Sequence, residues 1–528
     1  MMSWTDRVCA SGSLRRRLLP VSAGMVPSQL AINRHKTIST ASGPTHGQPA
    51  RPARFGPREL GLAALAATCA VTGYLLRPGA VTDDTYAFLD WGRDLRHGFL
   101  PLLEHRTFQP LPIAAGAGLS VFGSAAPTIT ILICLAALVL LAAASWRIVA
   151  LLGFGQPGPA LAALLVMATP VLPVLALVAY NNLPFATFVL WALLFELEER
   201  RVGAWALLIL AGLTRPEAWL FLLAYGALTW WRAGHPYAPG RWLPIAALAL
   251  GPIALWAALE WGLFGDPLYS LHNTTGPAVQ STHSNSPQAL WNTLRANIAT
   301  APLLASGLGV IAVGWFAPRR LAATTLTATA LAVLSILVLA GSNFNLPGRD
   351  FSVLFALVCV LSGAGAVLPA WVLSRLRRFP APVTFLAGVA GAALVIWLPA
   401  PEYVHALRRN FQRISITHDT GRTLTRDVTR VLPLIDVRGA PRHSVAMLGA
   451  VDNSELAWVL GVPYNAITDH LEPQTRLIVQ PSPATWARLK RYGLTDRTRS
   501  AIPRGWHVIA NGDWQIYTAG VGTPVRLR

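Results

Sequence analysis

The chain has 528 residues, of which 53% are hydrophobic and 13% are charged. Soluble globular proteins usually carry about 25% charged residues, so the composition excludes an ordinary soluble domain. Apolar stretches recur between residues 60 and 400, and many approach the ~20 residues that cross a bilayer. We therefore expect an α-helical polytopic membrane protein. Many of the basic residues lie in short loops between apolar stretches, where Arg and Lys mark the cytoplasmic side, so the net charge of +19 does not predict a nucleic-acid-binding surface.

Residues 1–55 are rich in Arg, Ser, Pro and Gly and predict a disordered basic cytoplasmic tail. The first predicted span covers residues 60–76 and follows Arg51, Arg54 and Arg58. Because Arg and Lys mark the cytoplasmic side, the N-terminus is expected inside and the next segment outside. Residues 56–400 form the predicted multi-span domain, with its first external loop at 78–126.

Two adjacent acids, Asp83 and Asp84, open this loop in a chain that has only 24 Asp and Glu residues. Desolvating a carboxylate is costly, so acids at a membrane boundary need partners or a task. Apolar side chains follow at helical spacing, among them Tyr86 and Trp91, which predicts an amphipathic helix in the membrane interface. At least one acid is expected to act as a catalytic general base, and the alternative is that the acids cap this helix.

The remaining spans are predicted from turn residues, which end each span, and from arginine-rich loops, which mark the cytoplasmic side. Residues 110–122 predict a re-entrant or interfacial helix, and 127–146 the second span. Residues 202–231 form either one long helix with Arg215-Pro216-Glu217 at its centre or two short helices that meet there. Two helices keep the later arginine-rich loops inside, whereas one helix would place them outside. We therefore expect two helices here and about eleven spans in total.

Residues 401–528 lose the long apolar runs and predict a small extracytoplasmic α/β domain. Helices are expected at 403–414, 423–434 and 484–492, and strands at 444–448 and 476–479. Residues 507–510 and 514–518 flank an Asn-Gly-Asp turn and predict a β-hairpin. Four tryptophans are candidates to stack on sugars, or else to fill the core of this domain: Trp458, Trp486, Trp506 and Trp514.

On this topology the external face collects polar residues at the ends of spans. Arg215, Arg349 and His272 are candidates to bind an anionic substrate, since guanidinium groups suit phosphate by charge and fork geometry. The alternative for the two arginines is structural pairing, with Glu217 and Asp350 as the neighbouring acids.

Four further residues on this face are candidates for the site. Glu104 is a second candidate acid or base, and His105 a candidate acceptor-binding group. The alternative is that Glu104-His105-Arg106 is only a salt-bridged loop end. Tyr86 and Asn182 complete the predicted substrate-binding set.

No strong metal-ligand spacing is present. Asp83 and Asp84 would need a third ligand such as Glu104 or Asp266 to bind a metal. No cofactor is therefore predicted, and a divalent cation stays an open alternative. The sequence also lacks a phosphate-binding loop, a dinucleotide fingerprint and a nucleophile elbow. The four cysteines are expected to be small core residues and not a disulfide framework or zinc site: Cys9, Cys69, Cys134 and Cys359.

The order of these features resembles the GT-C superfamily, integral membrane glycosyltransferases that use polyprenyl-phosphate sugars, and is similar to its bacterial arabinosyl- and mannosyltransferases. The resemblance covers about residues 60–400 and the C-terminal domain. It rests on the acidic stretch 83–86 (DDTY), on 104–105 (EH) with 110–112 (PLP), on 213–218 (LTRPEA) and on 264–270 (FGDPLYS). Residues 108–112 (FQPLP) lack the lysine of the comparable stretch in protein and lipid A transferases, so the chain departs from those branches.

The resemblance implies that Asp83 or Asp84 is the catalytic base and that Arg215, Arg349 or His272 holds the lipid phosphate. It implies an inverting transfer to an acceptor hydroxyl, either metal-independent or metal-assisted.

The sequence thus favours a glycosyltransferase of the cell membrane whose active site and C-terminal domain lie outside. The expected partners are a polyprenyl-phosphate sugar donor, membrane lipid, and a glycan, lipid or protein acceptor of the cell envelope. A transporter or flippase for lipid-linked substrates is the main alternative, and it predicts ionisable residues along a path through the bundle. A scaffold that displays the C-terminal domain is the third reading, and it leaves the first-loop acids unexplained.

Overall fold

The computed structural model describes residues 81–98, 107–234, 239–274, 287–341, 348–375 and 379–436, and then shorter stretches at 444–448, 453–463, 466–468, 471–472, 474–491, 501–519 and 525–526. The predicted tail and the first predicted span lie outside these residues. Glu104 and His105 also lie outside them.

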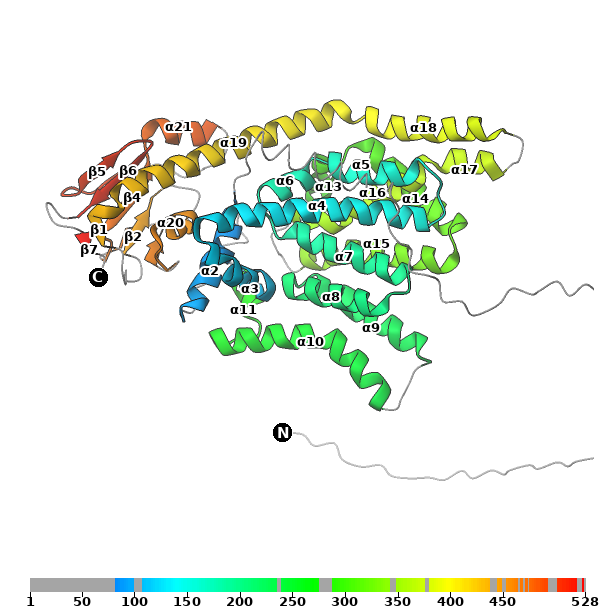
Figure 1. Cartoon of the computed structure of the whole chain (residues 1–528), viewed down its shortest axis with the longest axis horizontal. Helices are drawn as coiled ribbons and strands as arrows, with labels where there is room; N and C mark the ends of the chain where they lie inside the picture. Colours follow the sequence, from blue (N-terminus) through cyan, green and yellow to red (C-terminus); the bar gives the residue numbers. More distant parts are fainter. Residues whose placement is uncertain are drawn as a thin grey trace, which may run out of the picture. The chain divides into compact units, whose positions relative to one another are not determined.

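Helices dominate the described chain before residue 436 (Figure 1). The first group comprises α2 (Asp83–Arg96), α3 (Pro110–Leu119), the 3-10 turn η1 (Ser120–Ala125), α4 (Ala126–Leu151), α5 (Gly158–Ala168), α6 (Val171–Leu177), α7 (Asn182–Leu197), α8 (Arg201–Thr214) and α9 (Ala218–Arg232). The second comprises α10 (Pro239–Phe264), α11 (Tyr269–Thr274), α13 (Pro287–Asn297), α14 (Thr300–Phe316), α15 (Arg319–Gly341), η2 (Gly348–Phe351), α16 (Ser352–Ala366), α17 (Leu368–Arg375), α18 (Ala381–Trp397) and α19 (Ala400–Val431).

Four helical stretches of the described chain are long and apolar enough to cross a membrane: Pro110–Leu151, Trp242–Phe264, Arg319–Ala340 and Arg349–Arg375. Three bent pairs of helices raise the number to seven if each pair is one span. The chain therefore has the helices of a polytopic membrane protein. The count of about eleven spans stays a prediction.

Two of the predicted helix interruptions occur where the sequence places them. Gly123 in η1 has φ 54° and ψ −128°, and it separates α3 from α4. Arg215 has an extended backbone, with φ −150° and ψ 139°, and it ends α8. The ring of Pro216 disfavours a helical conformation at the preceding residue, which explains the break. The prediction of two helices that meet at Arg215 is therefore confirmed.

Glycine allows α2 and α3 to cross at backbone contact. A Cβ atom on Gly92 would lie 2.1 Å from the backbone nitrogen of Ala117, and one on Gly116 would lie 2.2 Å from the carbonyl oxygen of Phe88. No side chain fits at either position without moving a backbone. This crossing holds α2, which carries the two acids, tightly against α3.

Both predicted helical segments, 403–414 and 423–434, are helical, but they are not two helices: α19 is continuous over 32 residues and joins them, so the predicted division is wrong. The polar segment between the two predicted helices keeps helical spacing. Leu424, Val428 and Val431 lie on one buried face of α19 at intervals of three and four residues. Packing of this face stabilises a single helix through the polar segment.

The C-terminal region contains a mixed five-stranded sheet with the order β3-β2-β4-β6-β5. Its elements are β2 (Val445–Met447), α20 (Asn453–Leu460), β3 (Ile467–Thr468), β4 (Leu477–Pro481), α21 (Pro483–Arg491), β5 (His507–Asn511) and β6 (Trp514–Thr518), and a separate parallel pair joins β1 (Ile435–Asp436) to β7 (Val525–Arg526). The strand β2 runs parallel to β3 and β4, and β6 runs antiparallel to β4 and β5. The predicted hairpin is thus confirmed, while the helix α20 was not predicted from the sequence.

One hydrophobic core joins α2 to the C-terminal region. Ala87 and Trp91 of α2 belong to the same buried cluster as Val428 of α19 and Leu456 of α20. Trp91 is completely buried. The helix α2 therefore packs between the helical bundle and the C-terminal elements, and its first turn contacts both.

Candidate functional site

The two adjacent acids point to different partners. Both lie in the first turn of α2, after the N-cap residue Thr82. Oδ2 of Asp84 lies 2.6 Å from a guanidinium nitrogen of Arg349, in η2. Oδ1 of Asp83 accepts a 2.8 Å hydrogen bond from the hydroxyl of Ser454, in α20. Asp84 thus contacts the helical bundle, whereas Asp83 contacts the C-terminal region.

The Asp84–Arg349 pair is open to solvent. The side chain of Asp84 is 30% exposed and that of Arg349 is 32% exposed. The Arg349 guanidinium also lies over the ring of Tyr180, at 4.6 Å from the ring centroid. A ligand can therefore reach both charged groups, while Tyr180 holds one face of the guanidinium.

Behind this pair lies a buried network of charges. The carboxylate of Asp350, 4% exposed, accepts hydrogen bonds from Arg215 at 2.8 Å and from the amide of Asn182 at 3.0 Å. Arg215 also binds Glu217 through two nitrogens, at 2.6 to 3.2 Å. The ion pairs and hydrogen bonds among these side chains offset the free-energy cost of removing their charges from water.

Four residues predicted from the sequence therefore meet in one place: Asp84, Asn182, Arg215 and Arg349. The amide of Asn182 connects the exposed Asp84–Arg349 pair to the buried network. It donates to the carbonyl oxygen of Arg349 at 3.2 Å and to the carboxylate of Asp350. The structural pairing considered for Arg215 is present, since it binds both Glu217 and Asp350. Whether these residues bind substrate stays a prediction.

The turn between α6 and α7 fixes the start of α2. The backbone nitrogen of Thr82 donates to Val178 at 3.3 Å, and the hydroxyl of Thr85 donates to the carbonyl oxygen of Ala179 at 2.8 Å. Ala179 itself has φ 58°, a left-handed conformation that is uncommon for a residue with a side chain. Strained backbone of this kind persists where its surroundings hold it, and it concentrates at functional sites.

In the part of the chain that the structure describes, the side chain of His272 contacts Asp266 and no residue of this network. Its Nδ1 lies 2.6 Å from Oδ2 of Asp266, and its side chain is 63% exposed. The hydrogen bond from His272 lowers the pKa of Asp266 below its usual value. Among the described residues its side chain has no contact with Asp84 or Arg349, so its predicted role at the lipid phosphate stays a prediction.

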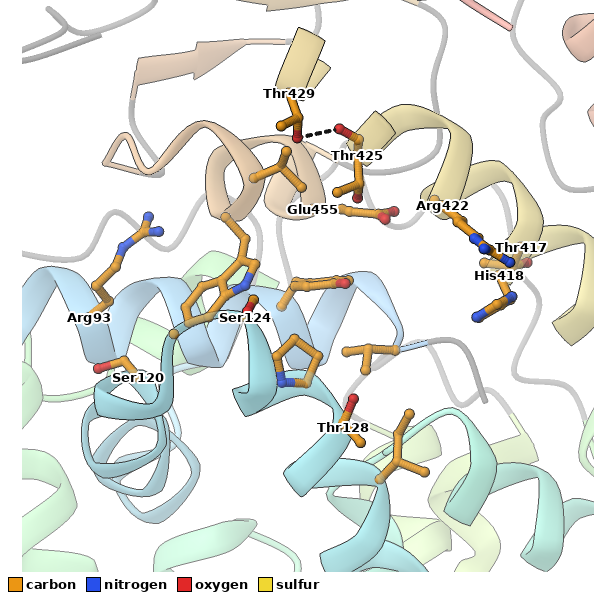
Figure 2. A pocket seen from close by; sticks show the side chains of 18 residues that line it. Arg93, Ser120, Ser124, Thr128, Thr417, His418, Arg422, Thr425, Thr429 and Glu455 are labelled. Atoms are coloured by element: carbon orange, nitrogen blue, oxygen red, sulfur yellow. Dashed lines mark hydrogen bonds between the residues drawn. The ribbon is translucent and has the colours of Figure 1, made fainter. Parts of the chain in front are cut away.

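A cavity of about 520 Å³ opens near the first turn of α2, between α2, the start of α4, α19 and α20 (Figure 2). Val81 and Tyr86, which flank the acids in sequence, line it. Trp458 of α20 lines it as well, whereas Trp486 and Trp514 are buried in the core.

The α19 side of this cavity was not predicted from the sequence, and it consists of Thr417, His418, Gly421, Arg422, Thr425 and Thr429. The repeat of Thr417, Gly421, Thr425 and Thr429 at intervals of four residues is the signal that identifies this face.

No group of three or more His, Cys, Asp or Glu side chains in the described residues is placed to hold a metal ion. Glu104, the third ligand considered for the Asp83-Asp84 pair, lies outside these residues. The other ligand considered, Asp266, pairs with His272. A divalent cation at the acids stays an open alternative.

No family model matches the chain, and no curated protein sequence matches it. Among solved structures, the chain is similar to the crystal structure of an oligosaccharyltransferase from Archaeoglobus fulgidus in complex with Zn and sulfate. The two share 13% sequence identity with a TM-score of 0.42, over 80% of this chain and 68% of that chain. A TM-score at this level does not define a common fold, so the function has to be inferred from the residues of this chain.

Proposed function

We propose that this protein is a membrane glycosyltransferase that moves a sugar from a polyprenyl-phosphate donor to an acceptor hydroxyl on the extracytoplasmic face. The observation that carries the proposal is the solvent-open ion pair between Asp84 and Arg349. It combines a carboxylate suited to take a proton with a guanidinium suited to hold a phosphate.

In this mechanism the donor phosphate binds to Arg349 and displaces Asp84 from it. The released carboxylate accepts the proton of the acceptor hydroxyl. The acceptor oxygen then forms a bond to the anomeric carbon of the sugar while the bond from that carbon to the phosphate oxygen breaks. The polyprenyl phosphate leaves with the electron pair, and Arg349 stabilises the charge that develops on it.

The buried network acts as a positioning device in this proposal. Asn182 holds the backbone of Arg349, and Asp350 links that segment to Arg215. Because these groups are already hydrogen-bonded before substrate arrives, the guanidinium of Arg349 needs little rearrangement to meet a phosphate.

The activity is tested with the full-length protein in lipid nanodiscs and a panel of radiolabelled polyprenyl-phosphate sugars, with cell-envelope glycolipid as the acceptor. We expect cleavage of at least one donor, release of polyprenyl phosphate and label in the acceptor, with no turnover of nucleotide sugars. Movement of intact donor across proteoliposome membranes without cleavage would instead establish the flippase alternative.

The side of the membrane is tested separately by labelling. Thr429 is exposed at the end of α19. A Thr429→Cys variant in a background without other cysteines is expected to react with a membrane-impermeant maleimide on intact cells. Reaction only after membrane disruption would place the C-terminal region inside and contradict the proposed sidedness.

A further inference from the structure

The cavity near the first turn of α2 has a polar wall that one face of α19 supplies. Thr417, Arg422, Thr425 and Thr429 follow at intervals of three to five residues, and they alternate along the helix with the buried Leu424 and Val428. The helix thus packs its apolar face into the core and turns its hydroxyl groups to the cavity, where Figure 2 shows Thr425, Arg422 and His418.

The opposite wall suits a sugar ring. The start of α4 and the turn before it contribute the hydroxyls of Ser120, Ser124 and Thr128, and Trp458 adds an aromatic surface. The hydroxyl of Ser120 donates to the carbonyl oxygen of Ala117, so its oxygen remains as an acceptor for a sugar hydroxyl. An aromatic ring packs on the C–H face of a sugar. The volume of about 520 Å³ lies in the range of small-molecule sites.

The charges of the cavity favour an anion. Arg422 has no hydrogen bond or ion pair with any residue that the structure describes, and its side chain is exposed. Arg93 is already engaged, since it pairs with Asp90 at 2.9 Å, donates to the carbonyl oxygen of Val462 at 2.6 Å and lies over the Trp458 ring. Of the two arginines among the described residues that line the cavity, Arg422 is therefore the one available to a ligand.

The carboxylic acid that lines the cavity, Glu455, carries less negative charge near neutral pH than an ordinary glutamate does. Burial, reinforced by the charge of Asp83, raises the pKa of Glu455 to about 7. Close packing accounts for the burial, because the position of a Cβ on Gly421 of α19 would lie 2.2 Å from the Glu455 carboxylate.

We propose that this cavity is the acceptor site and that it takes a saccharide bearing a carboxylate or phosphate group, with the anion on Arg422 and the sugar ring against Trp458. This inference rests on the proposed function: Val81 and Tyr86 of the cavity wall flank Asp83 and Asp84 in the sequence, so a bound acceptor would lie near the first turn of α2.

The test is binding in the absence of donor. The full-length protein, in nanodiscs of zwitterionic phosphatidylcholine, is titrated with glucuronate, glucose 6-phosphate, glucose and inorganic phosphate, and binding is followed by saturation-transfer NMR. We expect both anionic sugars to bind at least about 10-fold more tightly than glucose and than inorganic phosphate. Equal binding of glucose and glucuronate overturns the anionic part of the proposal, and equal binding of inorganic phosphate overturns the saccharide part.

Variants on one helix supply the matched control. Arg422→Gln is expected to weaken binding of glucuronate and glucose 6-phosphate about 10-fold or more and to leave glucose unchanged. Arg413→Gln, on an exposed α19 residue that does not line the cavity, is expected to bind like the wild type. Unchanged affinity in Arg422→Gln overturns the role of Arg422.

The binding experiment and the transfer assay distinguish failure of this inference from failure of the proposed function. Transfer without saccharide binding at Arg422 overturns this inference and leaves the glycosyltransferase proposal intact. Saccharide binding by a protein that cleaves no polyprenyl-phosphate sugar overturns the proposed function, and with it the assignment of the cavity to an acceptor.

Discussion

Asp84 and Arg349 form a 2.6 Å ion pair between the first turn of α2 and η2, two segments far apart in the chain. The neighbouring acid, Asp83, instead accepts a hydrogen bond from Ser454 of α20. Two adjacent carboxylates of the same type therefore have different surroundings, one in an ion pair with an arginine and one in a hydrogen bond with a serine.

Removing the guanidinium of Arg349 should weaken donor binding. Arg349→Gln is expected to raise the KM for a polyprenyl-phosphate sugar by about 10- to 100-fold, because charge-assisted hydrogen bonds contribute about 1.5–3 kcal/mol. Arg349→Lys keeps the charge but loses the fork, so an intermediate KM is expected. Steady-state kinetics with varied donor measure this effect. Arg430→Gln, on an exposed side chain of α19, is the control. An unchanged KM in Arg349→Gln would remove the phosphate role.

The buried network should matter for stability. Arg215→Met leaves Asp350 and Glu217 without their cation and is expected to lower the free energy of unfolding by about 3–5 kcal/mol. The exposed Arg430 lies 3.9 Å from the buried Asp427, which keeps a closer partner in Arg426 at 2.9 Å, so loss of Arg430 is expected to cost less than about 1 kcal/mol. Thermal unfolding of Arg215→Met and Arg430→Gln compares the two. Equal melting temperatures would show that the network does not hold the fold.

The crossing of α2 and α3 should tolerate no side chain at Gly116. Gly116→Ala places a Cβ about 2.2 Å from the carbonyl oxygen of Phe88, so α2 must move, and both the melting temperature and the transfer rate are expected to fall. Gly118→Ala, two residues away in the same helix, meets nothing within 4 Å and should be neutral or slightly stabilising. The account of α2 positioning fails if the two variants behave alike.

Stability should fall as pH rises through neutrality. The pKa of Glu455 is about 7 in the folded protein and 4.5 in the reference state. A pKa raised on folding contributes stability that is full below about pH 4.5 and is lost as pH rises through about 7. The loss amounts to up to about 3 kcal/mol. The melting temperature of the wild type is therefore expected to fall between about pH 5 and about pH 8, and that of Glu455→Gln to change much less. Parallel pH profiles for the two proteins would argue against a buried, protonated Glu455.

The sequence predicts which residues of the site are unusual, because charge is scarce in an apolar chain and Asp84, Arg215 and Arg349 stand out. It does not predict their partners. Glu217 lies two residues from Arg215, so that pairing is local, but the bond from Arg215 to Asp350 joins distant segments and depends on how the helices pack. The different partners of Asp83 and Asp84 also depend on how the helices pack, since Ser454 contacts Asp83 only in the folded chain.

The break at Arg215 was predictable because a proline acts on the residue before it. The continuity of α19 was not, because Gly421 weakens a helix by about 1 kcal/mol in isolation and its polar neighbours resemble a loop. Burial of Leu424 and Val428 and the packing of Glu455 on Gly421 outweigh that preference. The cavity wall on α19 was missed for this reason.

The most direct test of the central claim compares the kcat for sugar transfer of Asp84→Asn with that of Asp83→Asn, with folding checked by thermal unfolding. If Asp84 is the general base, Asp84→Asn lowers kcat by about 100-fold or more. Asp83→Asn keeps an oxygen that accepts from Ser454 and stays within about 3-fold of the wild type. Wild-type kcat in a folded Asp84→Asn protein would contradict the assignment of Asp84 as the base.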